Sequence, residues 1–258
     1  TGRRNSKEQI SARLEMAVRM MRLDKYLADM GEGTRQEVKK YIRRGSVTVN
    51  GELVRSPERK VDERDQVCLD GREVSYAAEE YFMLNKPAGV VSATEDKRDR
   101  TVLDLIQYKK RKDLFPVGRL DKDTEGLLLI TNDGALSHRL LSPRHHVDKT
   151  YYVEVQGHVT EETRAAFQRG VNIGTEEESL VTMPARLEIL EAGQSLSRVR
   201  LTIREGKFHQ VKRMFLSQGM EVSYLKRESM GSLRLDDSLA PGEYRPLTEH
   251  EIKRLKEE

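Results

Sequence analysis

The sequence predicts an α+β protein in which a small amino-terminal module precedes a larger second domain. Its 258 residues suffice for two domains that each bury a core. Two helical patterns and several short strand patterns fill residues 21–72, and strand-like segments alternate with helical ones across residues 80–258. The polar stretch 73–79 is the expected linker. Residues 1–20 fit this pattern poorly, so we expect a non-native or disordered extension there.

The small module opens with two helical patterns. The first, MRLDKYLADMG, places apolar residues at helical spacing and ends at Gly31. The second, TRQEVKKYIRRG, begins near Thr34 and ends at Gly45. Short strands follow in SVTVNGELV, where Asn50-Gly51 is a hairpin signal, and in VDERDQVCLDG.

The second of these helices is strongly basic. One acid, Glu37, stands against five cations, which are Arg35, Lys39, Lys40, Arg43 and Arg44. On an isolated helix such a face is usually only solvated. The succession of two helices and a small sheet, however, resembles the S4 RNA-binding domain. The resemblance implies that these five residues lie on RNA phosphates, where they give affinity and salt dependence with little reading of sequence.

Composition excludes several classes of protein. Hydrophobic residues make up 36% of the chain and charged residues 34%, and no apolar run approaches the roughly twenty residues of a membrane helix. The sequence does not open with an apolar segment of the signal-peptide type, so we expect a cytosolic protein without a membrane partner. The single cysteine, Cys68, excludes an internal disulfide, and the net charge of +3 is too small to identify a partner.

The run GRLDKDTEGLLLITNDG, residues 118–134, raises the question of reactive carboxylates. Asp121, Asp123 and Glu125 alternate in it, and DKDTEG matches the first six positions of a calcium loop. Positions nine and twelve are a leucine and an asparagine, where that loop needs a polar residue and a glutamate. The four apolar residues that follow the glycine indicate a buried strand instead. The metal interpretation fails, which leaves an acidic turn or one carboxylate with a chemical role.

This run is one of four motifs that follow one another along the chain. They are KPAGVVSA, GRLD with its following TEGLLLITNDG, PRHHVDKTYYVEV and REGKFHQVKRMF. Together with the tail GSLRLDDSLAPGEYRPLT, they resemble the RNA pseudouridine synthases, particularly the branch that modifies small-subunit ribosomal RNA. The resemblance covers nearly all of residues 21–258. It implies a second domain with a mixed, largely antiparallel sheet flanked by helices, and a reaction that needs neither cofactor nor metal.

The resemblance also implies a catalytic site of three residues. Asp121 matches the carboxylate that acts as a nucleophile or stabilises the detached sugar. Lys207 matches the basic residue that pairs with this aspartate and keeps it ionised. Tyr151, in the pattern Lys-x-Tyr, is expected to stack on the uracil and to help remove the C5 proton. Asp123 and Glu125 are then expected to be ordinary turn residues that face solvent.

Local patterns bear on the neighbours of these residues. In KTYYVEVQG, strand alternation places Tyr151 on the apolar face and its rival Tyr152 on the other face. After Lys207 a helix is expected to begin near Phe208. The residues that it should bury are Phe208, Val211, Phe215 and Leu216. The residues of its other side, expected to contact RNA, are His209, Gln210, Lys212 and Arg213.

Arg119 and a histidine pair complete the candidates. An enzyme that works on a base inside folded RNA must extrude the nucleotide, and the resemblance implies that Arg119 fills the space left behind. A salt bridge that braces the turn is its simpler role. His145 and His146 suggest a metal with Asp148, but adjacent residues of an extended chain face opposite ways and no further ligand cluster exists. We expect these histidines at the surface or on RNA.

The sequence therefore predicts a monomeric rRNA pseudouridine synthase, an isomerase that acts on bacterial 16S rRNA or on a small-subunit assembly intermediate. Whether Asp121 attacks C1′ of the ribose, attacks C6 of the base or acts through a glycal stays open. The alternatives are the same chemistry on 23S rRNA and a non-catalytic S4-type RNA-binding or ribosome-assembly factor. A calcium-binding module is a distant third.

Overall fold

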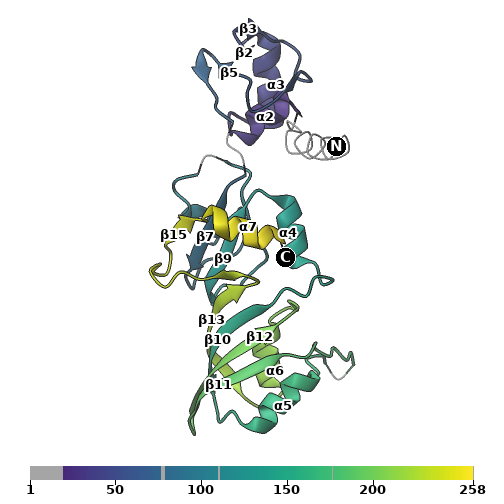
Figure 1. Cartoon of the computed structure of the whole chain (residues 1–258), viewed down its shortest axis with the longest axis vertical. Coiled ribbons are helices and arrows are strands. Elements are labelled where there is room, and N and C mark those ends of the chain that lie inside the picture. The colour runs from purple at the N-terminus through teal and green to yellow at the C-terminus, as the bar shows by residue number, and fades with distance from the viewer. Residues whose placement is uncertain (1–19, 77–78, 110, 176, 258) are drawn as a thin grey trace, which may run out of the picture. The chain divides into compact units, whose positions relative to one another are not determined.

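The structure of the protein, a computed structural model, describes residues 20–76, 79–109, 111–175 and 177–257. The chain divides into two compact units, which are coloured by residue number in Figure 1. The first unit comprises Thr1–Ala78 with Lys109–Asp113, and the second comprises Glu79–Tyr108 with Leu114–Glu258. The expected extension, residues 1–20, lies outside the described residues except for Met20.

The first unit contains two helices and a small sheet. The helices are α2 (Leu23–Asp29) and α3 (Arg35–Arg44). The four-stranded sheet has the order β3-β2-β5-β6, with β2 (Val47–Val49), β3 (Glu52–Leu53), β5 (Val67–Leu69) and β6 (Arg72–Glu73). A separate pair joins β1 (Met21–Arg22) to β4 (Lys60–Val61). One apolar cluster, which includes Leu23, Val38 and Val47, holds helices and sheet together.

Local chemistry sets the ends of α3 and the first hairpin. The Thr34 hydroxyl accepts from the Glu37 N–H, and the Glu37 carboxylate accepts from the Thr34 N–H, which forms a capping box. Gly45, with φ of 87°, ends the helix in a left-handed conformation. Asn50 and Gly51 both have positive φ, as the tight turn between β2 and β3 requires. The predicted helix limits and hairpin are confirmed.

The first unit also takes up a segment that the sequence assigns to the second domain. The boundary at residues 78 and 79 falls in the expected linker 73–79, yet Lys109–Asp113 clusters with the first unit. Arg111 in this segment is 3% exposed, and its Nη2 lies 3.3 Å from the carboxylate of Asp29. Its guanidinium also lies 5.3 Å from the ring centroid of Tyr76. The ion pair compensates the burial of this charge.

The second unit is built on one mixed sheet, nine-stranded over the described residues. Its order is β11-β12-β10-β13-β9-β7-β15, with β14 beside β13 and β8 beside β9. All pairs are antiparallel except β13 with β9, so the predicted mixed, largely antiparallel sheet is confirmed. The strands are β7 (Tyr81–Lys86), β8 (Phe115–Pro116), β9 (Glu125–Thr131), β10 (Lys149–Gln156), β11 (Arg186–Ala192), β12 (Leu196–Ile203), β13 (Glu221–Met230), β14 (Leu233–Arg234) and β15 (Tyr244–Pro246).

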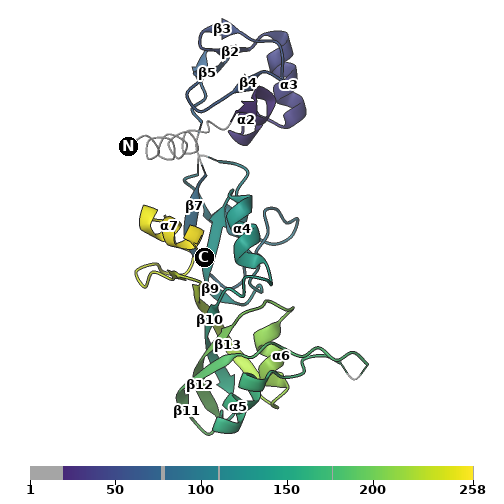
Figure 2. The same cartoon turned by 45° about the vertical axis from the view of Figure 1, so that its right-hand side comes forward.

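Helices cover the two halves of this sheet differently. They are the 3-10 helix η1 (Val102–Leu105), α4 (Gly134–Leu141), α5 (Glu161–Arg169), α6 (Gln210–Leu216) and α7 (Glu249–Glu257). Leu128 and Ile130 of β9 pack in one cluster with η1, whereas Leu127 and Leu129 pack in another with α4 and α7. This strand is buried on both faces, as predicted. The β10 and β13 half packs against α5 and α6, which lie beside it in Figure 2.

The parallel contact of β9 with β13 brings the acidic turn into the middle of the sheet. It spans two residue pairs, Lys226 with Glu125 and Arg227 with Gly126. Gly126 has φ of 98°, and a Cβ there would lie 2.3 Å from the Arg227 carbonyl oxygen. Only glycine allows this approach. The turn that carries Asp121 is thereby held next to β13.

Candidate active site

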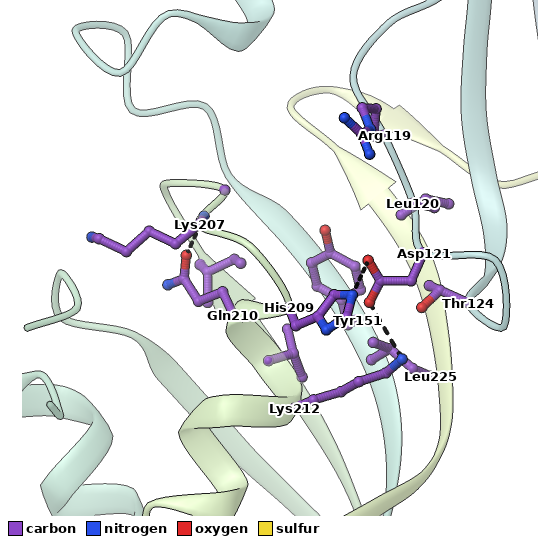
Figure 3. A pocket seen from close by; sticks show the side chains of 13 residues that line it. Arg119, Leu120, Asp121, Thr124, Tyr151, Lys207, His209, Gln210, Lys212 and Leu225 are labelled. Carbon is purple, nitrogen blue, oxygen red and sulfur yellow. Dashed lines mark hydrogen bonds and ion pairs between the residues drawn. The ribbon is translucent and has the colours of Figure 1, made fainter. Parts of the chain in front are cut away.

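A single pocket in the second unit contains the three residues that the sequence predicts to be catalytic. Asp121, Tyr151 and Lys207 all line it, together with Arg119 (Figure 3). They come from the turn before β9, from β10, and from the turn between β12 and α6. The sheet and α6 therefore gather segments that are far apart in the chain.

A buried lysine holds the turn that carries Asp121. Lys86, the last residue of β7, is 0% exposed. Its Nζ lies within hydrogen-bond distance of four carbonyl oxygens, those of Pro87 (3.0 Å), Asp121 (3.1 Å), Lys122 (3.2 Å) and Thr124 (2.8 Å). Burial lowers the pKa of Lys86 to about 8. Sequence reasoning missed this role, since a lysine at the end of a strand gives no sign of pointing inward.

The cation that pairs with Asp121 is not the predicted one. The Nζ of Lys212 lies 3.3 Å from the Asp121 carboxylate, and the dashed line in Figure 3 marks this ion pair. Lys207 instead pairs with Glu205, two residues before it on the same turn. The predicted pairing of Lys207 with Asp121 is therefore absent from the structure. Lys212, which the sequence assigns to RNA contact, takes its place.

Asp123 faces solvent, as the sequence predicts, whereas Glu125 is half-buried at the start of β9, and both have partners. Asp123 accepts from Lys212 at 2.6 Å, and Glu125 accepts from the Tyr224 hydroxyl at 2.7 Å. Burial acts to lower the pKa of Lys212, but the Asp123 hydrogen bond and the Asp121 charge outweigh it, so this pKa is raised. The hydrogen bond from Lys212 in turn lowers the pKa of Asp123. Two carboxylates thus keep the lysine charged.

His209 forms another side of the pocket. Its Nε2 lies 3.5 Å from the Asp121 carboxylate, and its backbone has φ of 48°, uncommon for a residue with a side chain. Gln210 holds this turn, because it accepts from the Lys207 N–H and donates to Glu205, both at 2.9 Å. The sequence assigns Gln210 to RNA contact. At 4% exposed, with its amide bonded internally, it braces the turn instead.

Tyr151 and Tyr152 lie on opposite faces of β10. Tyr151 is 8% exposed and lines the pocket. The Tyr152 hydroxyl donates to Glu154 at 3.0 Å, and its ring meets that of Tyr224 edge to face. The predicted alternation is confirmed, and it is Tyr151 that reaches the pocket.

The remaining predicted RNA contacts lie in different places. Arg119 is exposed at the pocket. Arg213 donates to the carbonyl oxygens of Phe208 and Ile173, which makes it a brace between two loops. The five basic residues of α3 belong to the first unit. Of these, Arg35 and Lys39 lie 3.7 and 3.8 Å from the carboxylate of Asp24, while Arg44 lies 3.7 Å from Asp70.

A buried threonine also lines the pocket, although the sequence analysis gives it no role. Thr124 lines the pocket and is 1% exposed. Within the described ranges its hydroxyl has no hydrogen-bond partner. A buried hydroxyl without a partner costs free energy, which a bound polar group would recover. Threonine is common in turns, so the sequence alone offered no signal.

Two absences hold for the described part of the chain. No three His, Cys, Asp or Glu side chains come together as a metal site there, and Asp148, beside the histidine pair, pairs with Arg204 at 2.8 Å. His145 and His146 are both exposed. None of the helices there is long and apolar enough to cross a membrane.

The fold and the pocket agree with one class of enzyme. Residues 80–217 match the model of the RNA pseudouridylate synthase family, and residues 21–67 match that of the S4 domain. The chain belongs to the RNA pseudouridine synthases, which are isomerases, and carries an amino-terminal S4 domain. The resemblance seen in the sequence motifs is confirmed at this level.

Individual relatives match along almost their full length. The chain is 48% identical over 239 residues to the uncharacterized RNA pseudouridine synthase YtzG of Bacillus subtilis (strain 168), covering 92% of this chain and 99% of the relative. It is 46% identical over 233 residues to ribosomal small subunit pseudouridine synthase A of Escherichia coli (strain K12), covering 90% and 98%. A crystal structure of a pseudouridylate synthase, 42% identical, has a TM-score of 0.63 and covers 91% of this chain and 99% of that one.

Proposed function

We propose that this synthase converts uridine to pseudouridine in ribosomal RNA, and that its substrate is 16S rRNA or a small-subunit assembly intermediate. The observation that carries the chemistry is the ion pair of Asp121 with Lys212, 3.3 Å apart, in a pocket that Tyr151 also lines. The choice of RNA is supported by the small-subunit relatives, such as the E. coli enzyme at 46% identity over 90% of the chain.

The reaction makes definite demands on the pocket. The bond from N1 to C1′ breaks, the base turns, and a bond from C5 to C1′ forms while a proton leaves C5 and one arrives at N1. Attack at C1′, attack at C6 and the glycal route all require an ionised carboxylate at Asp121. Lys212 favours that state, because a cation within about 4–6 Å stabilises the charged form of an acid.

The other pocket residues act on the base and on its neighbours. We assign Tyr151 to stack against the uracil and to take part in removal of the C5 proton, since its ring lies in the pocket with Asp121. Arg119, exposed at the same pocket, fills the place of the extruded nucleotide and reaches phosphate. Lys207, paired with Glu205, supports the turn next to the reacting carboxylate.

The S4 domain supplies sequence-independent affinity. Its helix α3 carries the five basic residues named above, at the surface of the first unit. Each phosphate contact of this kind releases counterions, so binding should weaken steeply as salt is raised. Site selection then falls to the pocket and to the fold of the RNA.

The test compares two carboxylates that lie two residues apart. Asp121→Asn should abolish pseudouridine formation on 16S rRNA fragments or assembly intermediates while RNA binding stays nearly intact, whereas Asp123→Asn should retain activity. Normal turnover by Asp121→Asn would overturn the mechanism.

Carbodiimide mapping of rRNA from cells with and without the gene identifies the substrate. Loss of a signal in 16S rRNA is expected, and loss in 23S rRNA instead would overturn the choice of substrate. No lost signal in either rRNA, together with retained rRNA binding, would favour the non-catalytic assembly factor.

A further inference from the structure

An aromatic residue beside the pocket is exposed where the sequence predicts burial. The helix α6 begins at Gln210 and not near Phe208, and Phe208 is 72% exposed. Its ring stacks on that of His209, with the centroids 3.7 Å apart and the planes 20° apart. Because so much of Phe208 is exposed, the ring face that points away from His209 is open.

Contacts of the backbone hold the turn that carries this ring. His209 has its backbone in the left-handed region, which turns the chain between Phe208 and the helix. Arg213 donates to the Phe208 carbonyl oxygen at 3.1 Å and also to the Ile173 carbonyl, so it fastens the turn to the neighbouring loop. An exposed aromatic side chain that is already ordered loses little conformational entropy when something stacks on it.

Phe208 is next to a pocket residue in the chain but does not itself line the pocket. His209 lines the pocket, and its Nε2 lies 3.5 Å from Asp121, whereas Phe208 is not among the pocket-lining residues. Phe208 therefore adjoins the pocket through His209, on which its ring stacks. A base in the pocket would meet Tyr151 and Asp121, and the open face of Phe208 is left for something next to it.

We propose that Phe208 stacks on an unpaired base that flanks the target uridine. The inference rests on the proposed function and names a specificity contact of that same site. A phenyl ring offers neither charge nor a hydrogen bond to phosphate, but every base has a face on which an aromatic ring stacks. The enzyme would thus hold two adjacent nucleotides, the target in the pocket and its neighbour on Phe208.

The experiment removes each stacking partner in turn. Its RNA is an oligoribonucleotide that spans the uridine mapped in wild-type rRNA, in an intact form and in two forms with an abasic nucleotide before or after the target. Steady-state pseudouridine formation is measured for the wild type, Phe208→Ala and Phe208→Tyr. Leu216→Ala is the matched control, because Leu216 is an exposed apolar residue, 67% exposed, at the other end of α6.

On intact RNA, Phe208→Ala should raise KM about tenfold with kcat nearly unchanged, in line with the cost of losing one stacked base. Phe208→Tyr and Leu216→Ala should behave like the wild type. With one of the two abasic RNAs, the wild type itself should show the raised KM, and Phe208→Ala should add nothing further.

Two results would overturn the inference: no effect of Phe208→Ala on intact RNA, or the same rise in KM on intact and both abasic RNAs. The second result would mean that Phe208 supports the turn without touching a base. A wild-type enzyme that forms no pseudouridine in any rRNA would overturn the proposed function itself, which distinguishes the two failures.

Discussion

The ammonium nitrogen of Lys212 lies 3.3 Å from the carboxylate of Asp121, across two segments of the chain that only the fold brings together. Replacing this lysine by Met removes the cation that favours the ionised aspartate. We expect Lys212→Met to lower kcat about tenfold or more, because the reacting carboxylate loses the positive charge beside it. The measurement is steady-state kcat for pseudouridine formation.

Lys207→Met is the control for this prediction, because the Lys207 ammonium pairs with Glu205. It should lower kcat far less than Lys212→Met does. If Lys207→Met lowered kcat strongly and Lys212→Met did not, the pairing predicted from the sequence would be correct and the assignment of Lys212 would be wrong.

Thr124→Val should lower activity without lowering the stability of the protein. The two side chains have the same shape, but valine lacks the buried hydroxyl that has no partner in the described structure. Without substrate, the variant should be as stable as the wild type or more so, by up to about 1–3 kcal/mol. Its kcat/KM should fall, because the substrate loses a hydrogen bond. Urea unfolding and steady-state kinetics check both parts, and a destabilised variant would contradict the prediction.

We expect the free energy of unfolding to rise with pH because Lys86 is buried. Its pKa is about 8 in the folded protein, below the ordinary 10.5 that it has when unfolded. Between these values the unfolded chain binds more protons, so stability rises as pH increases and the cost of the buried charge disappears. The free energy of unfolding of the wild type, relative to Lys86→Met, should therefore grow between about pH 8 and about pH 10.5. A constant difference would mean that the four carbonyl oxygens keep the ammonium charged.

Gly126 should tolerate alanine less well than another glycine of similar backbone conformation. Gly242 has φ of 93° and no neighbour within 4 Å of an added Cβ, so Gly242→Ala should cost about 1–3 kcal/mol from the backbone alone. In Gly126→Ala the Cβ would also lie 2.3 Å from the Arg227 carbonyl oxygen. This variant should lose more stability and also activity, because it pushes β9 away from β13. Equal unfolding free energies for the two variants would refute the argument.

Local sequence patterns predicted correctly those features of the structure that depend on a single segment of the chain. The alternation of KTYYVEV separates Tyr151 from Tyr152, since neighbours in a strand point to opposite faces. The four apolar residues after Gly126 mark a strand that is buried on both faces. The capping box at Thr34 and the glycine at position 45 likewise set the limits of α3.

The start of the helix after Lys207 was predicted wrongly because a backbone angle cannot be read from the sequence pattern. The left-handed conformation of His209 delays the helix to Gln210, so Phe208 lies before the helix and is exposed. Residues other than glycine adopt this conformation only where the surroundings favour it, here through Gln210 and Arg213. The ion pair of Lys212 with Asp121 joins α6 to the turn before β9, a contact that no local pattern reveals.

By itself, the sequence determined the two-domain α+β organisation, the family and the turn that carries the reactive carboxylate, because these depend on periodicity and on contiguous motifs. The tertiary structure decided which cation reaches Asp121, that Lys86 holds the turn of this residue, that Thr124 lines the pocket and that Phe208 is exposed. Those are contacts between segments distant in the chain, and their geometry follows from how the sheet and α6 pack together.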